Sequence, residues 1–190
     1  MQMTSCFRTY APFYSNIEIK ALLPDPSRVR QIAEQTGEDK GATLQEDTFF
    51  TSERGRLKLR RFSTTHGELI YYERPDKPCP KQSHYVLCTT GDPDGLRQVL
   101  EKALGIEGIV RKKRHLFLFG QIRIHLDEVE GLGSFLELEV ILQEGQQPEE
   151  GTAIANELME KLAVKKKDLI TGAYIDLISQ NYHQRMGISK

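Results

Sequence analysis

The sequence lacks the features that define several protein classes. It has no Trp and only three cysteines, Cys6, Cys79 and Cys88, whose odd number and wide spacing fit neither a disulfide framework nor a metal motif. No apolar run approaches the roughly 20 residues of a membrane helix. Residues 1–15 contain no continuous apolar stretch, so a secretory signal is not expected. Free thiols are typical of a reducing compartment, and we therefore expect a cytoplasmic protein without a membrane segment.

An excess of charge of one sign is also missing. The chain carries 26 Lys and Arg residues against 27 Asp and Glu residues, a net charge of −1. Binding to nucleic acid or to an anionic membrane requires a broad basic surface, so neither is an expected partner. The sequence shows no Ser-His-Asp or Cys-His arrangement. Its Gly131–Gly133 segment lies between two predicted strands and is typical of a hairpin turn. Any basic site must therefore be local.

An order of elements that occurs twice is the most informative feature present. In each half, a strand is followed by a helix and then by three strands. Both helices begin with Asp-Pro, at Asp25 and Asp92, and stop at a glycine, Gly37 and Gly105. This β-α-β-β-β duplication predicts an α+β fold whose eight strands form a closed antiparallel barrel or a pair of sheets, with helices outside. The predicted strands are 15–23, 43–50, 56–62, 68–75, 83–90, 108–119, 121–129 and 134–140, and helices are predicted within 24–37, 91–105, 148–164 and 168–178.

Charged residues share one face of several predicted strands, because successive side chains in a strand point to opposite faces. In 134–140, Glu137 and Glu139 lie opposite three aliphatic residues, and in 56–62, Lys58 and Arg60 do the same. The ordinary explanation is a solvated sheet face. However, surfaces usually mix both signs, whereas these faces are segregated. The alternative is a charged barrel interior, which suits a polyanion bound with divalent cations. The other residues of these faces are Asn16, Glu18, Lys20, Arg123, His125 and Asp127, with Lys112 and Arg114 favoured over their neighbours in 110–114.

Several of these segments, in this order, resemble the CYTH superfamily of triphosphate tunnel metalloenzymes. They are NIEIK, QEDTFF, GRLKLR, ELIYYERPD, VRKKR, RIHLDEVEGLGSFLELEV and GAYIDL, which together extend from Asn16 to about Leu177. That family includes class IV adenylyl cyclases, thiamine triphosphatases and inorganic tripolyphosphatases. The resemblance implies an eight-stranded antiparallel tunnel in a single domain over 16–180. We expect flexible tails over 1–15 and 181–190.

The resemblance also implies roles for individual residues. Lys20, Arg60 and Asp127 would take part in catalysis. One position departs from the family pattern, because Asn16 stands where the Glu-x-Glu-x-Lys signature has its first Glu, and an amide brings no charge to a metal. The implied phosphate-binding residues are Lys20, Lys58, Arg60, Arg74, Lys112, Arg114 and Arg123, and the implied ligands of Mg²⁺ or Mn²⁺ are Glu18, Glu137, Glu139 and Asp127.

Three functions remain open at this stage, all with a small-molecule triphosphate as partner. The first is a metal-dependent phosphohydrolase acting on tripolyphosphate, a nucleoside triphosphate or thiamine triphosphate. The second is a class IV adenylyl cyclase that makes cyclic AMP and pyrophosphate from ATP. The third is a polyphosphate- or nucleotide-binding module with little turnover, for which Asn16 is the motive. The sequence leaves the oligomeric state open.

Overall fold

The computed structural model describes residues 14–186, in which two β-α-β-β-β units follow one another and two further helices come last. This order confirms the predicted duplication. The first unit consists of β1 (Tyr14–Leu22), α1 (Pro26–Thr36), β2 (Glu38–Phe50), β3 (Arg56–Arg61) and β4 (Gly67–Glu73). The second consists of β5 (Lys81–Thr90), α2 (Pro93–Leu104), β6 (Ile106–Phe119), β7 (Ile122–Val129) and β8 (Gly133–Ile141), followed by α3 (Pro148–Lys161), a 3-10 turn (Lys166–Asp168) and α4 (Tyr174–Met186).

The two crossover helices begin and end where the sequence signals place them. The Asp25 carboxylate accepts a hydrogen bond from the backbone N–H of Arg28, and Asp92 accepts one from Gly95, at 3.1 and 2.9 Å. Each bond satisfies an amide that the first helical turn leaves without a partner. Gly105 ends α2 with φ of 77°, a conformation that favours glycine.

The ends of the fold differ from the predicted domain boundaries. Strand β1 begins at Tyr14 instead of 16, and α4 continues to Met186, past the predicted start of a tail at 181. The sequence contains no Gly or Pro between 173 and 186 that would stop this helix. Residues 1–13 and 187–190 of the predicted tails lie outside the described residues. Among the helices of residues 14–186, none has the length and apolar character needed to cross a membrane.

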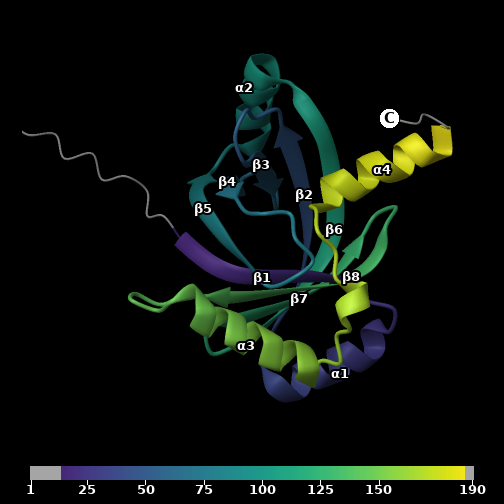
Figure 1. Ribbon diagram of the computed structural model, residues 1–190. Coiled ribbons are helices and arrows are strands. Elements are labelled where there is room, and N and C mark those ends of the chain that lie inside the picture. The colour runs from purple at the N-terminus through teal and green to yellow at the C-terminus, as the bar shows by residue number, and fades with distance from the viewer. Residues whose placement is uncertain (1–13, 187–190) are drawn as a thin grey trace, which may run out of the picture.

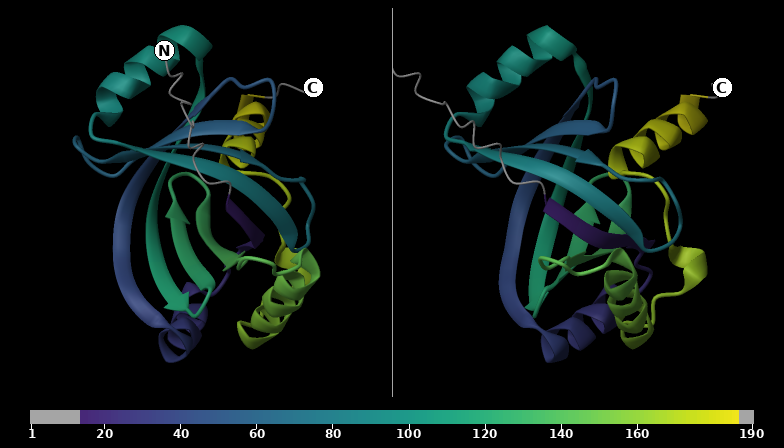
Figure 2. Two further views of the ribbon diagram at one scale, coloured as in Figure 1. Left: turned by 90° about the vertical axis from the view of Figure 1, so that its left-hand side faces the viewer. Right: turned by 60° about the vertical axis from the view of Figure 1, so that its left-hand side comes forward.

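The eight strands form a closed antiparallel barrel in the order β1-β5-β4-β3-β2-β6-β7-β8, with β8 paired to β1 (Figures 1 and 2). Each unit places its first strand beside the other unit. Thus β1 lies between β5 and β8, and β5 lies between β1 and β4. This exchange joins the two halves into one barrel. Of the two architectures predicted from the sequence, the closed barrel is confirmed.

The main hydrophobic core lies outside the barrel, between its wall and helices α1 and α3, which cover β7, β8 and β1 in Figure 1. The aliphatic residues of β1 and β8 point to these helices, for example Ile17 and Leu138, each at most 1% exposed. They pack with Ala33 of α1 and with Ala155 and Leu158 of α3. Each fully buried side chain of this kind contributes about 1.5–3 kcal/mol. Because the apolar rows face outward, the charged rows of the same strands face the barrel interior, which rules out the solvated-face explanation.

A strap formed by residues 166–176 covers one end of the barrel. The backbone N–H of Ile170 donates to the carbonyl of Lys20 at 2.9 Å, and Leu169 forms a β-bridge with Ala21. The side chain of Tyr174 is buried at this end of the barrel, where it packs with Phe49 of β2 and Phe135 of β8. The opposite end of the barrel has no such cover among the described residues. Within residues 14–186, the barrel interior is therefore a pocket whose mouth lies at the end opposite the strap.

Candidate functional site

The barrel encloses a cavity of about 770 Å³ lined by the inward rows of all eight strands and by Ala173 and Tyr174 of the strap. The structure brings together every predicted phosphate-binding residue at this cavity. Lys112 and Arg114, which the sequence analysis favoured over their neighbours, lie on the inner side of β6. The lining residues predicted from the sequence are Glu18, Lys20, Lys58, Arg60, Arg74, Lys112, Arg114, Arg123, Glu137 and Glu139.

A carboxylate that the sequence analysis missed organises the basic side of the cavity. Asp47 on β2 is 1% exposed and accepts hydrogen bonds from Arg60 at 2.8 and 2.9 Å, from Lys58 at 3.1 Å and from Lys112 at 2.8 Å. Burial alone would raise the pKa of Asp47, but the charges of Arg60, Lys112 and Lys58 hold it well below 3.8. Burial also lowers the pKa of Lys112 to about 7 and that of Lys58 to about 8. One buried anion thus holds three cationic groups in place.

A second carboxylate, Asp127 on β7, holds Arg114. It accepts from Arg114 at 2.7 and 2.6 Å through both of its oxygens, and from the Tyr174 hydroxyl at 2.8 Å. Burial opposes the charge of Asp127, but Arg114 lowers its pKa to about 2. Asp127 is not among the residues that line the cavity. The structure therefore places this predicted metal ligand behind Arg114, where it fixes the orientation of the guanidinium.

Glu18 on β1 is also engaged by a cation. Its carboxylate accepts a hydrogen bond from Arg74, and both side chains are nearly fully buried. Two residues earlier, Asn16 is 3% exposed and lines the same cavity, and its carbonyl Oδ1 has no hydrogen-bond partner among the described residues. The family's missing carboxylate would therefore have stood inside the cavity beside Glu18.

Three side chains of β7 and β8 form a group that can hold a metal ion. His125, Glu137 and Glu139 each offer a ligand atom, and these atoms lie within 4.8 Å of one another. Glu137 accepts hydrogen bonds from Lys20 and, at 3.0 Å, from Arg114. Burial and the neighbouring Glu137 raise the pKa of Glu139, whose contact with Arg123 is 3.3 Å long. Burial and the charge of Arg114 push the pKa of His125 well below 6.5, so its imidazole is neutral.

The open mouth of the cavity is aromatic and aliphatic. Tyr14 and Tyr85, paired across β1 and β5, stack with ring centroids 5.3 Å apart and planes at 25°. Leu87, Leu116 and Phe62, near the same end of their strands, also line the cavity. Lys40 and Glu68 line this end as well, so the interior has three zones, namely a mouth rich in apolar side chains, a charged middle and an end covered by Tyr174.

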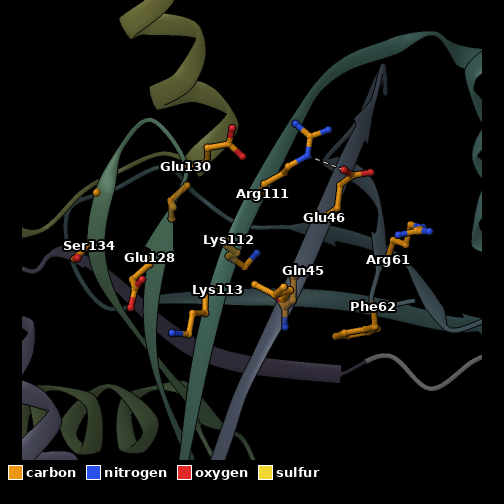
Figure 3. A pocket seen from close by; sticks show the side chains of 13 residues that line it. Gln45, Glu46, Arg61, Phe62, Arg111, Lys112, Lys113, Glu128, Glu130 and Ser134 are labelled. Atoms are coloured by element: carbon orange, nitrogen blue, oxygen red, sulfur yellow. Dashed lines mark hydrogen bonds and ion pairs between the residues drawn. The ribbon is translucent and has the colours of Figure 1, made fainter. Parts of the chain in front are cut away.

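Another hollow, of about 780 Å³, lies at the outer surface of β2, β6 and β7. Figure 3 shows it, with Arg111 donating a hydrogen bond to Glu46 across these strands. Arg111 and Glu128 are exposed to solvent there. Exposed ion pairs contribute little energy, and this hollow shares only Lys112 with the buried, convergent charges of the barrel interior. The candidate site is the interior.

An antiparallel barrel with basic and acidic side chains facing its interior defines the class of triphosphate tunnel proteins. The chain belongs to the CYTH domain family, whose profile matches residues 15–174. A protein of Methanocaldococcus jannaschii that is provisionally named an adenylate cyclase is 31% identical over 88 residues, which are 45% of this chain and 50% of that protein. The matched region thus spans about half the length of that relative.

Solved structures share the fold. The PH1012 protein of Pyrococcus horikoshii superposes with a TM-score of 0.77 at 26% identity, over 85% of this chain and 98% of that one. A protein of Hippeastrum, provisionally named an adenylyl cyclase and described as having a dominant triphosphatase activity, superposes with a TM-score of 0.56 at 17% identity. That match covers 84% of this chain and 91% of the other. At such an identity the likeness shows the fold alone.

Proposed function

We propose that this protein is a divalent-metal-dependent hydrolase of a triphosphate-containing substrate. The excess of positive charge inside the barrel is the observation that supports this most. With Lys40 added to the seven predicted residues, eight cationic side chains of the interior meet six carboxylates, those of Glu18, Asp47, Glu68, Asp127, Glu137 and Glu139. When every lysine is charged and His125 is neutral, this leaves a net charge of +2. Unbalanced charge inside a protein is unfavourable unless a ligand compensates it. A triphosphate with one divalent cation has the opposite net charge.

The zones of the cavity give the substrate a direction. The apolar mouth suits an organic group, and the triphosphate would extend from it towards Lys20, whose ammonium lies 4.1 Å from the centroid of the Tyr174 ring at the covered end. Lys58, Arg60 and Lys112, gathered by Asp47, would donate to phosphate oxygens in the middle of the cavity. Arg114, fixed by Asp127, would donate to the same chain. In this orientation the terminal phosphorus lies deepest.

The residues at this depth fit a divalent cation. The carboxylates of Glu137 and Glu139 would hold it, because their oxygens and a nitrogen of His125 converge within 4.8 Å and Glu139 is only weakly engaged. When bound, such a cation neutralises charge on phosphate oxygens and lowers the pKa of a bound water. Glu18 and Asp127, which we also expected as ligands, do not belong to this group and are held by Arg74 and Arg114. Lys20 would stabilise the charge that develops on the phosphoryl oxygens.

The products of the reaction test this proposal. The protein would be incubated with Mg²⁺ or Mn²⁺ and, separately, with tripolyphosphate, ATP and thiamine triphosphate. We expect orthophosphate and the corresponding diphosphate. Cyclic AMP with pyrophosphate would instead establish a cyclase, a function that the aromatic mouth also favours because it could stack on adenine. Tight binding without any product would establish a binding module.

The tyrosine pair at the mouth leads to a first prediction. Replacing Tyr85 by Ala should weaken binding of triphosphate esters with an aromatic group by about tenfold, since stacking on an aromatic side chain contributes about 1–3 kcal/mol. Binding of inorganic tripolyphosphate should not change. The matched control is Tyr71→Ala, because Tyr71 on β4 does not line the cavity. Isothermal titration calorimetry with each ligand measures both effects, and an equal loss for tripolyphosphate would contradict the assigned direction.

Lys112 leads to a second prediction, concerning pH. Because burial lowers its pKa to about 7, Lys112 is largely neutral above that pH, whereas a bound polyanion favours its charged form. The affinity for tripolyphosphate should therefore fall as the pH rises from 6 to 9, with proton uptake on binding at pH 8. In Lys112→Arg, which cannot lose its charge, the affinity should fall less steeply. Calorimetry in buffers of different ionisation enthalpy measures the uptake, and equal uptake by the two proteins would contradict the prediction.

The same shift has a consequence for stability. Lys112 binds its proton more weakly in the folded chain than at the ordinary lysine pKa of 10.5. The unfolded chain therefore holds more protons between about pH 7 and 10.5, and this group makes the protein more stable as the pH rises through that range.

A further inference from the structure

His125 has no hydrogen-bond partner within residues 14–186, although its side chain is buried in the barrel. The side chain lies on β7 directly opposite Glu137 of β8, is 5% exposed, and lines the cavity. Neither Nδ1 nor Nε2 has a partner among the described residues. A buried polar atom without a partner costs about 1–3 kcal/mol. His115, one strand away on β6, pairs with Asp39 at 2.6 Å, so the chain does satisfy a histidine elsewhere.

The two neighbouring carboxylates are not equally occupied. Glu137 is shared by Lys20 and Arg114, whereas the one ion pair of Glu139 in the described part of the chain is the 3.3 Å contact with Arg123, whose side chain is 43% exposed. Hence one imidazole nitrogen and one carboxylate of the group of three are available for a cation. The group is rigid, because all three residues belong to two paired strands of a closed barrel.

We propose that His125 is a metal ligand and that the group His125, Glu137 and Glu139 selects Mn²⁺ and later transition metals over Mg²⁺. The proposal rests on the metal-dependent hydrolase proposed above and specifies its cation. Mg²⁺ prefers six oxygen ligands in octahedral geometry, whereas an imidazole nitrogen suits transition metals. Affinities for a mixed nitrogen and oxygen site increase from Mn²⁺ to Co²⁺, so Co²⁺ should bind more tightly than Mn²⁺. The cation also gives His125 the partner that residues 14–186 do not provide.

Electron paramagnetic resonance of Mn²⁺ added to the full chain, without triphosphate, tests the proposal directly. Pulsed measurements should show modulation from a directly bound ¹⁴N nucleus, which changes when the histidines are labelled with ¹⁵N. Titration of the free Mn²⁺ signal gives the dissociation constant, and competition gives that of Mg²⁺. We expect Mn²⁺ to bind at least about tenfold more tightly than Mg²⁺.

In His125→Gln, the nitrogen modulation should vanish, and Mn²⁺ should bind about 10–100-fold more weakly while Mg²⁺ changes little. Since His125 makes no hydrogen bond to the described residues, this variant should fold, and its melting temperature without metal verifies that. Glu139→Gln should weaken binding of both metals. The control His115→Gln should retain the modulation.

Two results would overturn the proposal. Mn²⁺ bound without nitrogen modulation would mean a site made of oxygens only. Unchanged Mn²⁺ binding in His125→Gln, with weaker binding of tripolyphosphate in the absence of metal, would assign His125 to the phosphate chain instead. Neither result bears on whether triphosphate is hydrolysed. Conversely, a nitrogen-ligated Mn²⁺ in a protein that does not turn over any triphosphate would leave this site standing and reject the hydrolase.

Discussion

Replacing Asp47 by Asn is expected to lower the free energy of unfolding by about 3–5 kcal/mol, and tripolyphosphate is expected to restore a large part of the loss. The substitution keeps the size of the side chain but leaves Arg60, Lys58 and Lys112 inside the barrel without their common anion. Removing one partner from a buried ion pair is far more destabilising than the pair itself is stabilising. A polyanion in the cavity replaces the missing negative charge. Urea unfolding with and without tripolyphosphate measures both effects.

The control is the adjacent residue of the same strand. Glu46 points out of the barrel and pairs with Arg111 and Arg97 on the surface. Glu46→Gln should therefore change stability by only about 0.5 kcal/mol, without any special rescue by tripolyphosphate. Equal losses of stability in both variants would contradict this prediction. So would tripolyphosphate stabilising Asp47→Asn no more than the wild type, because Arg60, Lys58 and Lys112 would then not form a polyanion site.

The pH dependence of the same variant gives an independent check. The pKa of Asp47 in the folded chain is well below 3.8, because Arg60 and Lys112 outweigh the effect of burial. The stabilisation that ionised Asp47 gives the folded chain is therefore complete above the pKa of Asp47 in the unfolded chain. It is lost as the pH falls through its pKa in the folded chain. Asp47→Asn should lack this part of the acid-induced loss of stability.

The element order and the inward rows could be predicted from the sequence because strands repeat every two residues. In 134–140, Glu137 and Glu139 lie on one face and three aliphatic residues lie on the other. Deciding which face points into the barrel therefore fixes the direction of all seven side chains. The charged face could be assigned to the barrel interior because acidic residues (Glu137, Glu139) and basic residues (Lys58, Arg60) lie on separate strands, whereas an ordinary surface mixes both signs. The barrel, its helices on the outside and the CYTH family are all confirmed.

Asp47 could not be identified in the same way. It follows Glu46, so each face of that strand carries one acid and the alternation gives no preference. What decides between them is the cross-strand partner, Arg60 opposite Asp47, and a register between strands is not readable from either strand alone. The signal for Asp47 in the sequence was the basic pair Lys58 and Arg60 of 56–62, which requires a nearby anion when it faces the barrel interior.

The state of Asp127 also depends on contacts with residues that are distant in the sequence. Its alternation pattern correctly predicts an inward direction. However, its oxygens are taken by Arg114, 13 residues away, and by Tyr174, 47 residues away. The strap that brings Tyr174 to the barrel is held by tertiary hydrogen bonds such as that from Ile170 to Lys20, for which the sequence has no local pattern. Whether Asp127 acts in catalysis beyond holding Arg114 stays a prediction.

Two buried lysines at the covered end of the barrel have different surroundings. Lys20 lines the cavity, donates to Glu137 and lies over the Tyr174 ring. Lys81 is not among the lining residues. Its ammonium donates to the backbone carbonyls of Lys77, Ile170 and Thr171 at 3.0, 3.4 and 3.3 Å, which ties β5 to the strap. Lys20 therefore directs its charge into the cavity, whereas Lys81 anchors the strap.

Lys20→Met is expected to reduce kcat for triphosphate hydrolysis by about 10²–10³-fold, the usual cost of removing one preorganised donor to a transition-state oxygen. Lys81→Met, the matched control, should lower the melting temperature but keep kcat within about twofold at temperatures where it is folded, since its donors serve only the backbone. Steady-state kinetics and thermal unfolding of both variants separate the two roles. If Lys81→Met lost as much turnover as Lys20→Met while remaining folded, the effect would come from the position of the strap, and the assignment of Lys20 to the phosphoryl group would fail.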